Sequence, residues 1–206
     1  MQSYKLTPSR FSSALKHLRS CDDDLASVLD AFGEPPMWER EPGFPTLIHI
    51  ILEQQVSLAS AQAAFDRLCL VVSPLTPSGV LALNDETMKT IGFSRQKARY
   101  VRRLSKAILD GSLELEELEK VDEDTIRGTL LSLDGVGPWT ADIYLLMAML
   151  RPDVWPTGDL ALAAALQKLK GLHSRPDIAA MNEFAERWRP WRAVAARVLW
   201  HFYLSS

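Results

Sequence analysis

Apolar residues recur along most of this chain with the period of an α-helix, and short polar stretches separate one apolar segment from the next. Phe44, Leu47, Ile48 and Ile51 follow the i, i+3, i+4, i+7 spacing that places apolar side chains on one helical face. No segment between turn signals alternates apolar and polar residues with a sustained period of two, as a strand would. The pattern therefore predicts an all-α fold.

Residues typical of helix ends set the expected boundaries. Thr7 followed by Pro8 is typical of an N-cap and a first helical position, and Gly33 is typical of a helix end. The predicted segments are 7–19, 22–33, 44–51, 59–72, 94–109, 122–131, 138–150, 159–169, 176–187 and 191–204, with further helix starts at Thr76 and Asn84.

Composition narrows the class of protein. Of 206 residues, 47% are hydrophobic and 24% charged, with a net charge of −3, which excludes disordered and membrane-spanning classes. Cys21 and Cys69 are too few for a disulfide framework, a zinc ribbon or a four-cysteine iron–sulfur cluster. Residues 1–8 lack the apolar core of a signal peptide, so we expect a soluble cytoplasmic protein.

Charge is distributed unevenly. Residues 89–106 contain seven Lys and Arg and no acid, whereas residues 110–124 contain eight acids and only Lys120 as a base. Two solvated helix faces of opposite sign would account for this pattern. A basic strip that lies along phosphates is the alternative, although charge alone favours the solvated faces and does not settle the question.

The segment 133–141, Leu-Asp-Gly-Val-Gly-Pro-Trp-Thr-Ala, predicts a very tight turn between two helices. Gly135 and Gly137 can adopt a positive φ and leave the backbone uncovered, and Pro138 suits a first helical position. Backbone N–H groups at such a turn point outward at a helix N-terminus, which forms a ready site for a phosphate oxygen. An ordinary corner between two helices is the alternative reading.

Taken whole, this string resembles the helix–hairpin–helix motif of the base-excision DNA glycosylase superfamily. Trp-Pro-Thr-Gly-Asp at 155–159, Ile-Leu-Glu-Gln-Gln-Val-Ser at 51–57 and Glu-Arg-Trp-Arg-Pro-Trp-Arg at 186–192 match further blocks in the same order. The last block is similar to the 3-methyladenine DNA glycosylase II family. The resemblance extends over roughly 44–203 and lacks that family's N-terminal β-rich domain, so a catalytic core alone is expected.

The resemblance implies a fold of two helical lobes. One lobe comprises residues 44–151 and contains the helix–hairpin–helix motif at about 122–150. The other combines 1–43 with 152–206 and carries Asp159. The substrate site is then expected in the cleft between the lobes, where ligand sites often form.

Asp159 begins a predicted helix, and an N-cap is its ordinary structural role. By resemblance it is the catalytic carboxylate. Cleavage of an N-glycosidic bond builds positive charge on the sugar, which a nearby carboxylate stabilises, and the same group can orient or deprotonate the attacking water.

Two tryptophans are expected to line the base pocket. By resemblance, Trp139 and Trp200 receive the flipped base, and an electron-rich aromatic wall suits a cationic alkylated purine. Core packing is the alternative for both. Superfamily members that also cut the strand carry a lysine at the position of Trp139, so we expect no strand cleavage. Ile143 stands where that family has a tyrosine, so we expect the base pocket of this chain to differ from the pocket of the family.

Contacts with DNA are expected at two places. The resemblance assigns the hairpin residues Gly135, Val136, Gly137 and Thr140 to the phosphate backbone. It also assigns Gln55 to the wedge that fills the gap left by a flipped nucleotide, although amide capping of a helix end explains Gln55 nearly as well.

The resemblance further implies a monovalent cation, Na⁺ or K⁺, on the backbone carbonyls of Leu131, Leu133 and Val136. No catalytic divalent metal and no iron–sulfur cluster are expected.

The predicted activity is that of a monomeric, monofunctional DNA glycosylase that hydrolyses alkylated purines of the 3-methyladenine and 7-methylguanine type from double-stranded DNA. A glycosylase for other base lesions and a hairpin module that only binds DNA are the alternatives. A binding module has no need of Asp159 or of a tryptophan-lined pocket.

Overall fold

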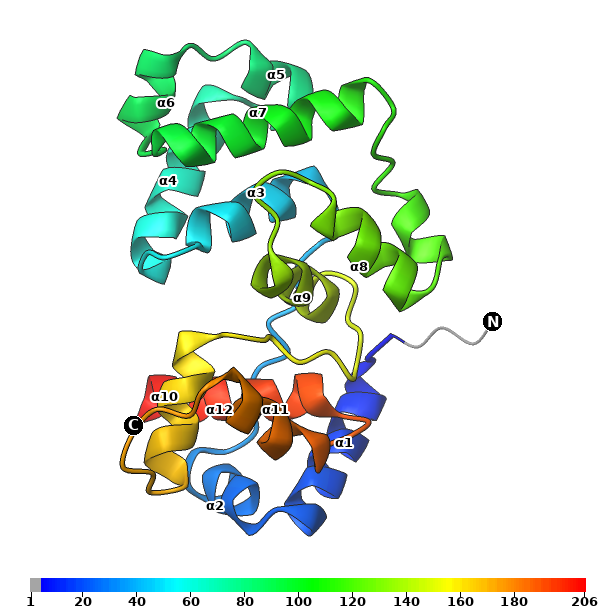
Figure 1. Cartoon of the computed structure of the whole chain (residues 1–206), viewed down its shortest axis with the longest axis vertical. Coiled ribbons are helices and arrows are strands. Elements are labelled where there is room, and N and C mark those ends of the chain that lie inside the picture. The colour runs from blue at the N-terminus through cyan, green and yellow to red at the C-terminus, as the bar shows by residue number, and fades with distance from the viewer. Residues whose placement is uncertain (1–4) are drawn as a thin grey trace. The chain divides into compact units, whose positions relative to one another are not determined.

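The computed structural model describes residues 5–206, and over that range the chain forms twelve α-helices and one 3₁₀ helix, with no strand (Figure 1). The predicted all-α fold is confirmed. The expectation about a signal peptide rested partly on residues 1–4, which lie outside the described residues. Within the described range, no helix is both long and apolar enough to cross a bilayer.

Two compact units make up the chain. Unit 1 comprises residues 1–39 and 145–206, and unit 2 comprises residues 40–144, so the boundary between them falls within helix α9 (Pro138–Met147). Each unit has its own set of packed helices.

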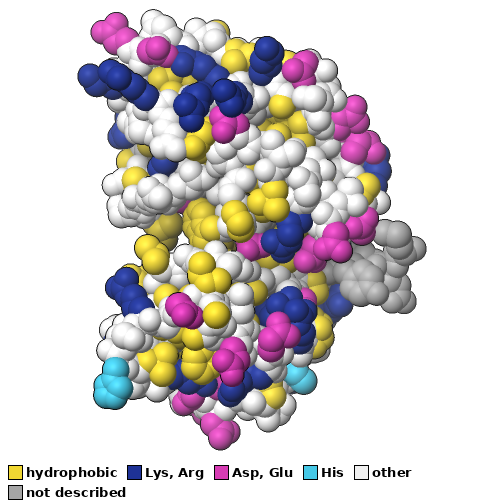
Figure 2. Space-filling model, viewed as in Figure 1, with side chains coloured by type: hydrophobic (Ala, Val, Ile, Leu, Met, Phe, Trp, Pro, Cys, Tyr) yellow, Lys and Arg dark blue, Asp and Glu magenta, His cyan; other side chains and the backbone are white. Residues whose placement is uncertain are grey.

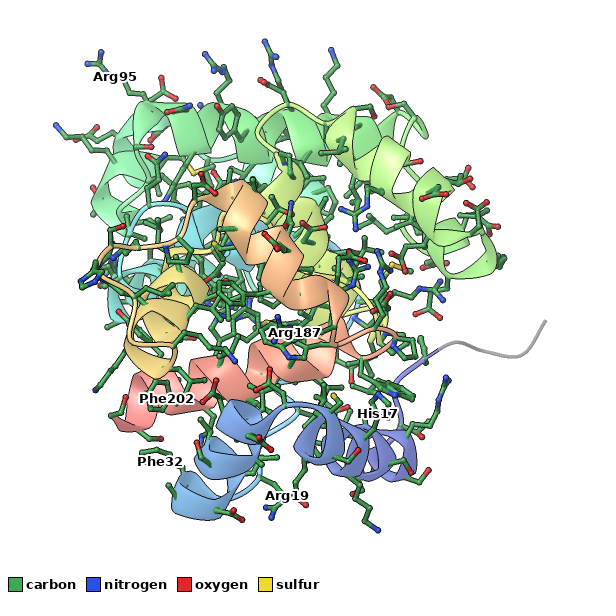
Figure 3. The ribbon with its side chains drawn as sticks, turned by 60° about the horizontal axis from the view of Figure 1, so that its bottom comes forward. His17, Arg19, Phe32, Arg95, Arg187 and Phe202 are labelled. Atoms are coloured by element: carbon green, nitrogen blue, oxygen red, sulfur yellow. The ribbon has the colours of Figure 1, made fainter. Side chains whose placement is uncertain are left out.

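Unit 1 is built around its last helix. This helix, α12 (Arg192–Ser205), packs against α1 (Pro8–Cys21), α2 (Asp23–Phe32), α10 (Leu160–Leu169) and α11 (Ile178–Glu186). Residues 193–200 of α12 are all buried, so the helix forms the centre of an apolar core. Near its C-terminal end, Phe202 meets Phe32 of α2 edge to face, with ring centroids 5.9 Å apart (Figure 3).

A fully buried arginine forms hydrogen bonds between the centre of this core and the chain around Met37 and Leu146. Arg197 donates hydrogen bonds to the carbonyls of Met37, Ala193 and Leu146 at 2.6, 2.9 and 2.9 Å. Burial lowers its pKa to about 10, so it remains a cation at neutral pH. Because its three carbonyl partners satisfy a charge buried in an apolar core, Arg197 holds the chain around Met37 in place.

Unit 2 is arranged around its longest helix, α7 (Arg95–Leu109), which packs against three others. These are α3 (Phe44–Glu53), α5 (Pro77–Leu81) and α6 (Asp85–Ile91), while α4 (Leu58–Val71) packs on α3 and α6. The 3₁₀ helix η1 (Glu117–Lys120) and α8 (Glu123–Leu131) follow, and α9 begins in this unit. Side chains of Ser94, Asn84 and Asp122 cap their helices as the sequence predicts.

Several predicted boundaries differ from the observed ones by up to three residues, and one element was not predicted. Helices α1 and α3 each run two residues beyond the predicted ends, to Cys21 and Glu53. Helix α9 ends at Met147, before the predicted residue 150, because Leu150 adopts a left-handed φ of +54° and the N–H of Arg151 bonds back to Leu145. Helix α11 begins at Ile178, after the predicted residue 176, because Asp177 is its N-cap. The 3₁₀ helix in the acidic segment was not predicted.

Candidate functional site

Asp159 follows a tight turn that places its carboxylate at the start of α10. Gly158 has a φ of +80°, and the N–H of Asp159 donates to the carbonyl of Pro156 at 3.2 Å, which closes the turn. The side chain is only 7% exposed, and its Oδ1 accepts the N–H of Leu162 at 2.9 Å. Asp159 is therefore an N-cap, and its buried carboxylate lies at a helix N-terminus.

Trp200 lies directly against this carboxylate. Its indole N–H donates to Oδ1 of Asp159 at 3.3 Å. Trp38 meets the Trp200 ring edge to face, with centroids 6.5 Å apart and planes at 73°. Trp38 has a left-handed φ of +47°, which is unusual for a bulky residue. The preceding residue, Met37, is held by the hydrogen bond from Arg197 to its carbonyl. Unit 1 thus brings together two predicted site residues, Asp159 and Trp200, and the aromatic ring of Trp38.

A hollow of about 490 Å³ opens beside Asp159 within unit 1. It lies at the N-terminal ends of α10 and α11, and its lining includes Gly158, Leu160, Ile178 and Met181. Leu160 and Ile178 are 71% and 53% exposed, respectively. The carboxylate therefore sits at the edge of an open, mainly apolar depression.

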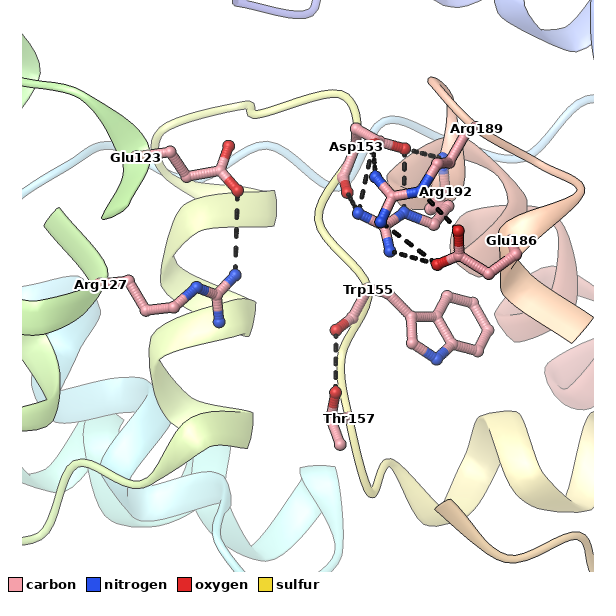
Figure 4. Close-up of polar contacts among 8 residues, drawn as sticks. All are labelled: Glu123, Arg127, Asp153, Trp155, Thr157, Glu186, Arg189 and Arg192. Carbon is pink, nitrogen blue, oxygen red and sulfur yellow. Dashed lines mark hydrogen bonds and ion pairs between the residues drawn. The ribbon is translucent and has the colours of Figure 1, made fainter. Parts of the chain in front are cut away.

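An ion-pair network holds the loop that leads to Asp159. Asp153 accepts Arg189 Nη1 at 2.6 Å and Arg192 Nε at 3.0 Å, and both arginines also pair with Glu186 (Figure 4). Further along the loop, Trp155 is 5% exposed and packs on Trp188. These contacts fix both ends of the loop before the turn at Asp159.

The predicted hairpin lies between α8 and α9 in unit 2. Arg127 of α8 pairs with the buried Asp142 of α9. It also pairs with Glu123 on its own helix at 3.8 Å (Figure 4). Gly135 has a φ of +89°, and a Cβ there would lie 2.2 Å from Cγ of Tyr100. The hairpin therefore requires glycine at 135, both for the backbone conformation and for contact with α7.

The other predicted hairpin residues differ in their surroundings. Gly137 does not have a positive φ, and a Cβ added there would meet no atom within 4 Å, so this side of the turn is open. Val136 is 5% exposed. Thr140 is 2% exposed, and its hydroxyl accepts Gln54 Nε2 at 2.8 Å. The structure therefore places the Thr140 side chain beneath the hairpin, bound to the end of α3.

The turn after α3 is held from two sides. Gln54 donates through Nε2 to the carbonyl of Gly135 at 2.8 Å as well as to Thr140. Lys97 of α7 donates through Nζ to the carbonyls of Leu52 and Gln54 at 2.7 and 2.8 Å, and burial lowers the pKa of this lysine. The next residue, Gln55, is exposed with a left-handed φ of +56°. An exposed side chain thus projects from a rigidly bound turn.

The remaining predicted site residues also lie in unit 2. Trp139 is half-buried at the start of α9, and Ile143 is 2% exposed within the core. Of the predicted cation ligands, the Leu133 carbonyl accepts the N–H of Val136 at 3.1 Å. The described residues contain no cluster of three or more His, Cys, Asp or Glu side chains suited to a metal ion.

Sequence reasoning did not identify Trp38, Gln54 or Lys97 as parts of these sites. Trp38 follows a Pro-Pro break and carries no periodic signal. Lys97 belongs to a strongly basic helix, where a single lysine turned inward is not distinguishable from its solvated neighbours.

The chain matches a family model described as HhH-GPD superfamily base excision DNA repair protein over residues 48–190. That match contains the hairpin, the turn at Asp159, helices α4 to α9, and helices α10 and α11 of unit 1.

Among individual proteins, it is 27% identical to the alkylbase DNA glycosidase-like protein mag2 of Schizosaccharomyces pombe, over 93% of each chain. It is 38% identical to a probable bifunctional transcriptional activator/DNA repair enzyme AlkA of Mycobacterium tuberculosis, over 90% of this chain and 41% of that one. The structure of S. pombe 3-methyladenine DNA glycosylase (Mag1) in complex with abasic DNA matches with a TM-score of 0.86 and 26% identity, covering 91% of this chain and 95% of that one.

Proposed function

This chain belongs to the HhH-GPD superfamily of base excision DNA repair proteins, and from that premise we propose that it is a monofunctional glycosylase for alkylated purines in double-stranded DNA. The observation that carries the proposal is the Asp159 carboxylate, held at a helix start by Leu162 and Trp200 beside an open hollow. The relatives support the same substrate class, since their names refer to alkylbase and 3-methyladenine glycosylases.

Asp159 would act on the sugar rather than on the base. As the bond between C1′ and the base nitrogen breaks, its electron pair leaves with the base and positive charge develops on the sugar. The ionised carboxylate stabilises that charge, while the oxygen of a water molecule bonds to C1′ and its proton passes to the carboxylate. A cationic alkylpurine departs as a neutral base, so this step requires no general acid.

The aromatic residues would recognise the flipped base. Trp200 contacts Asp159 directly, and we assign Trp200 and Trp139 to the walls of the base pocket. Because an aromatic face attracts a cation, such walls favour an alkylated purine over a neutral one. Tryptophan at 139 cannot form a Schiff base, so the abasic strand is expected to remain uncut.

The hairpin and the turn after α3 would hold the DNA. The open backbone at Gly137 leaves room for a phosphate oxygen at the N-terminus of α9. Gln55 projects from a turn held by Lys97 and Gln54, which suits a side chain that enters the base stack. We propose these as phosphate and wedge contacts, respectively.

A monovalent cation would fit the hairpin. Leu133, Val136 and Leu131 offer backbone carbonyls there, and carbonyl oxygens suit a hard cation. The Leu133 oxygen keeps a second lone pair beside its bond from Val136. When bound, Na⁺ or K⁺ would neutralise part of the charge of a phosphate oxygen. We infer no part for it in bond cleavage, and no other cofactor is required by the proposed reaction.

The experiment is base release from methylated duplex DNA under single-turnover conditions, comparing the wild type with Asp159→Asn. Asparagine is also a good N-cap, so the helix start survives while the charge is lost. We expect release of 3-methyladenine or 7-methylguanine by the wild type, a decrease of about 10²–10³-fold in the variant, and an intact strand until alkali is added.

Asp177→Asn is the matched control. Asp177 caps α11 through Ala180 and lines the same hollow, so the substitution removes the same charge at the same kind of position. Its release rate should stay near that of the wild type. DNA binding without any base release by the wild type would contradict the proposal and favour a binding module. Release of only oxidised or mismatched bases would favour a glycosylase of another specificity.

A further inference from the structure

A second surface with a distinct chemistry lies on unit 2, away from Asp159 in the chain. It is a groove of about 820 Å³ between α6 and α7, which we call the basic groove. Lys and Arg side chains gather over these helices (dark blue in Figure 2). Its floor is apolar, formed by Met88, Phe93 and Ala98, and its charged lining comprises Lys89, Arg95, Arg99, Arg102, Arg103, Lys106, Asp85 and Glu86.

The cations of α7 form a line rather than a cluster. Each of these cations lies three or four residues from another, so all share one face of the helix. They are Arg95, Arg99, Arg102, Arg103 and Lys106. With a rise of about 1.5 Å per residue, the line from Arg95 to Lys106 extends over about 16 Å. Arg95 projects outward at one end of this line (Figure 3).

Acidic neighbours offset only part of this charge. Arg102 pairs with Asp85 at 2.5 Å, and Asp134 accepts Arg103 at 2.6 Å and lies 3.6 Å from Arg99. Two carboxylates, Asp85 and Glu86, face six Lys and Arg among the described residues that line the groove. A positive local surface therefore exists on a chain whose net charge is −3.

The basic groove is continuous with the hairpin. Asp134, which receives Arg103, directly precedes Gly135, and Gly135 itself packs against Tyr100 of α7. Beyond the C-terminal end of α7, residues 110–124 carry eight acids, of which all but Glu123 are exposed. The hairpin therefore lies beside the middle of the line of cations, and the acids that follow α7 repel a polyanion from the segment beyond its C-terminal end.

We propose that the basic groove binds the phosphate backbone of the DNA duplex at a distance from the damaged nucleotide, as an extension of the hairpin site. The proposal rests on the proposed function, because it takes the hairpin as a phosphate site. A line of cations about 16 Å long fits a repeating polyanion better than a single phosphate. Its continuity with the hairpin favours DNA over an acidic protein segment.

The test measures how the affinity for undamaged duplex DNA depends on salt. Lys89→Gln, Arg95→Gln and Lys106→Gln, combined in one variant, remove three exposed groove cations without breaking the pairs with Asp85 or Asp134. Each lost phosphate contact lowers the slope of log K against log salt by about 0.9, so we expect a slope smaller by about 2–3. Base release at saturating DNA should be unchanged.

Lys16→Gln, Lys120→Gln and Arg175→Gln, combined, form the control, because they remove the same charge from exposed positions outside the groove. This variant should keep the wild-type slope. Wild-type slope in the groove variant, or an equal loss in the control, would overturn the proposal.

A glutamate-rich peptide that binds the wild type but not the groove variant, with DNA binding unchanged, would also overturn it in favour of a protein partner. Absence of base release by the wild type, together with the expected difference in slope, would instead contradict the proposed function and support the groove.

Discussion

The indole N–H of Trp200 and the backbone N–H of Leu162 converge on the same oxygen, Oδ1 of Asp159, at 3.3 and 2.9 Å. Two donors on one oxygen define the orientation of the carboxylate group, so its other oxygen has a set direction as well. Trp38 packs edge to face on Trp200 and limits the movement of that ring. Unit 1 thus holds the Asp159 carboxylate in one orientation, as the proposed reaction beside a sugar would require.

Replacing Trp200 by phenylalanine should separate the two roles of this side chain. Phe keeps an aromatic wall but removes the donor to Asp159. We expect the single-turnover rate of base release to fall by about 10-fold, which corresponds to about 1.4 kcal/mol, with a smaller change in the DNA concentration that gives half the maximal rate. The measurement is base release at saturating enzyme over a range of concentrations.

Trp188→Phe provides the control, because it removes the same N–H from a second buried aspartate of unit 1. Trp188 Nε1 donates to Asp22 at 3.0 Å, away from Asp159 in the chain. This variant should lose about 1–2 kcal/mol of stability and keep its rate. If both variants lost rate in parallel with stability, the orienting role of Trp200 would be disproved.

Trp38→Leu should lower the same rate as Trp200→Phe, because it removes the ring that packs against Trp200. We expect about a 3–10-fold decrease, and no further decrease when Trp38→Leu is added to Asp159→Asn, since the effect passes through the carboxylate. A decrease of equal size in both backgrounds would show that Trp38 acts on folding or DNA binding instead.

Much of the architecture could be predicted from local signals. The capping residues Thr7, Asn84, Ser94 and Asp122 each begin a helix at the expected position, because a side-chain oxygen that satisfies an N–H is a local interaction. The end of α9 was misplaced because it depends on the left-handed Leu150, a conformation that no glycine or asparagine signals.

The candidate sites were predictable only where a short motif carries them. Gly135 and Asp159 stand within compact strings, so their turns could be recognised. The hydrogen bonds from Gln54 to Gly135 and from Lys97 to the end of α3 join residues 81 and 43–45 positions apart. Such long-range contacts arise from packing between helices, which local patterns do not encode.

Arg197→Met should destabilise the protein strongly. The substitution keeps the apolar stem but leaves the carbonyls of Met37, Ala193 and Leu146 without their donor. We expect a loss of about 3 kcal/mol in the free energy of unfolding, measured by urea denaturation. Arg187→Met, at an exposed position, should change it by less than about 0.5 kcal/mol. Equal effects would mean that the buried hydrogen bonds of Arg197 contribute little.

The stability of the protein should decrease in acid partly through Asp22. Burial opposes ionisation of this carboxyl, but hydrogen bonds from Trp188 and the N–H of Leu25, together with Lys170, lower its pKa overall. Because the pKa is lower in the folded state, the ionised carboxylate stabilises the fold at pH values above its ordinary pKa of about 3.9. This contribution is lost as the pH falls through the folded pKa.

Asp22→Asn should therefore be less stable than the wild type at pH 7, with a difference that shrinks as pH falls from about 5 to 3. Urea denaturation at each pH measures this difference. Glu183→Gln, at an exposed carboxylate of the same unit, should show no such dependence. A gap between wild type and Asp22→Asn that stayed constant with pH would contradict the assignment.

Two glycines of the hairpin should respond differently to the same change. Gly135→Ala places a Cβ 2.2 Å from the Tyr100 ring on a backbone with a φ of +89°, so we expect a loss of at least about 2 kcal/mol in unfolding free energy. Gly137→Ala meets no neighbouring atom and should leave stability nearly unchanged. Its new methyl group stands on the open side of the turn, so the affinity for duplex DNA should fall by about 10-fold. Urea denaturation measures the change in stability, and DNA titration measures the change in affinity. A stable Gly137→Ala protein with wild-type affinity would contradict the proposed contact between the hairpin and DNA.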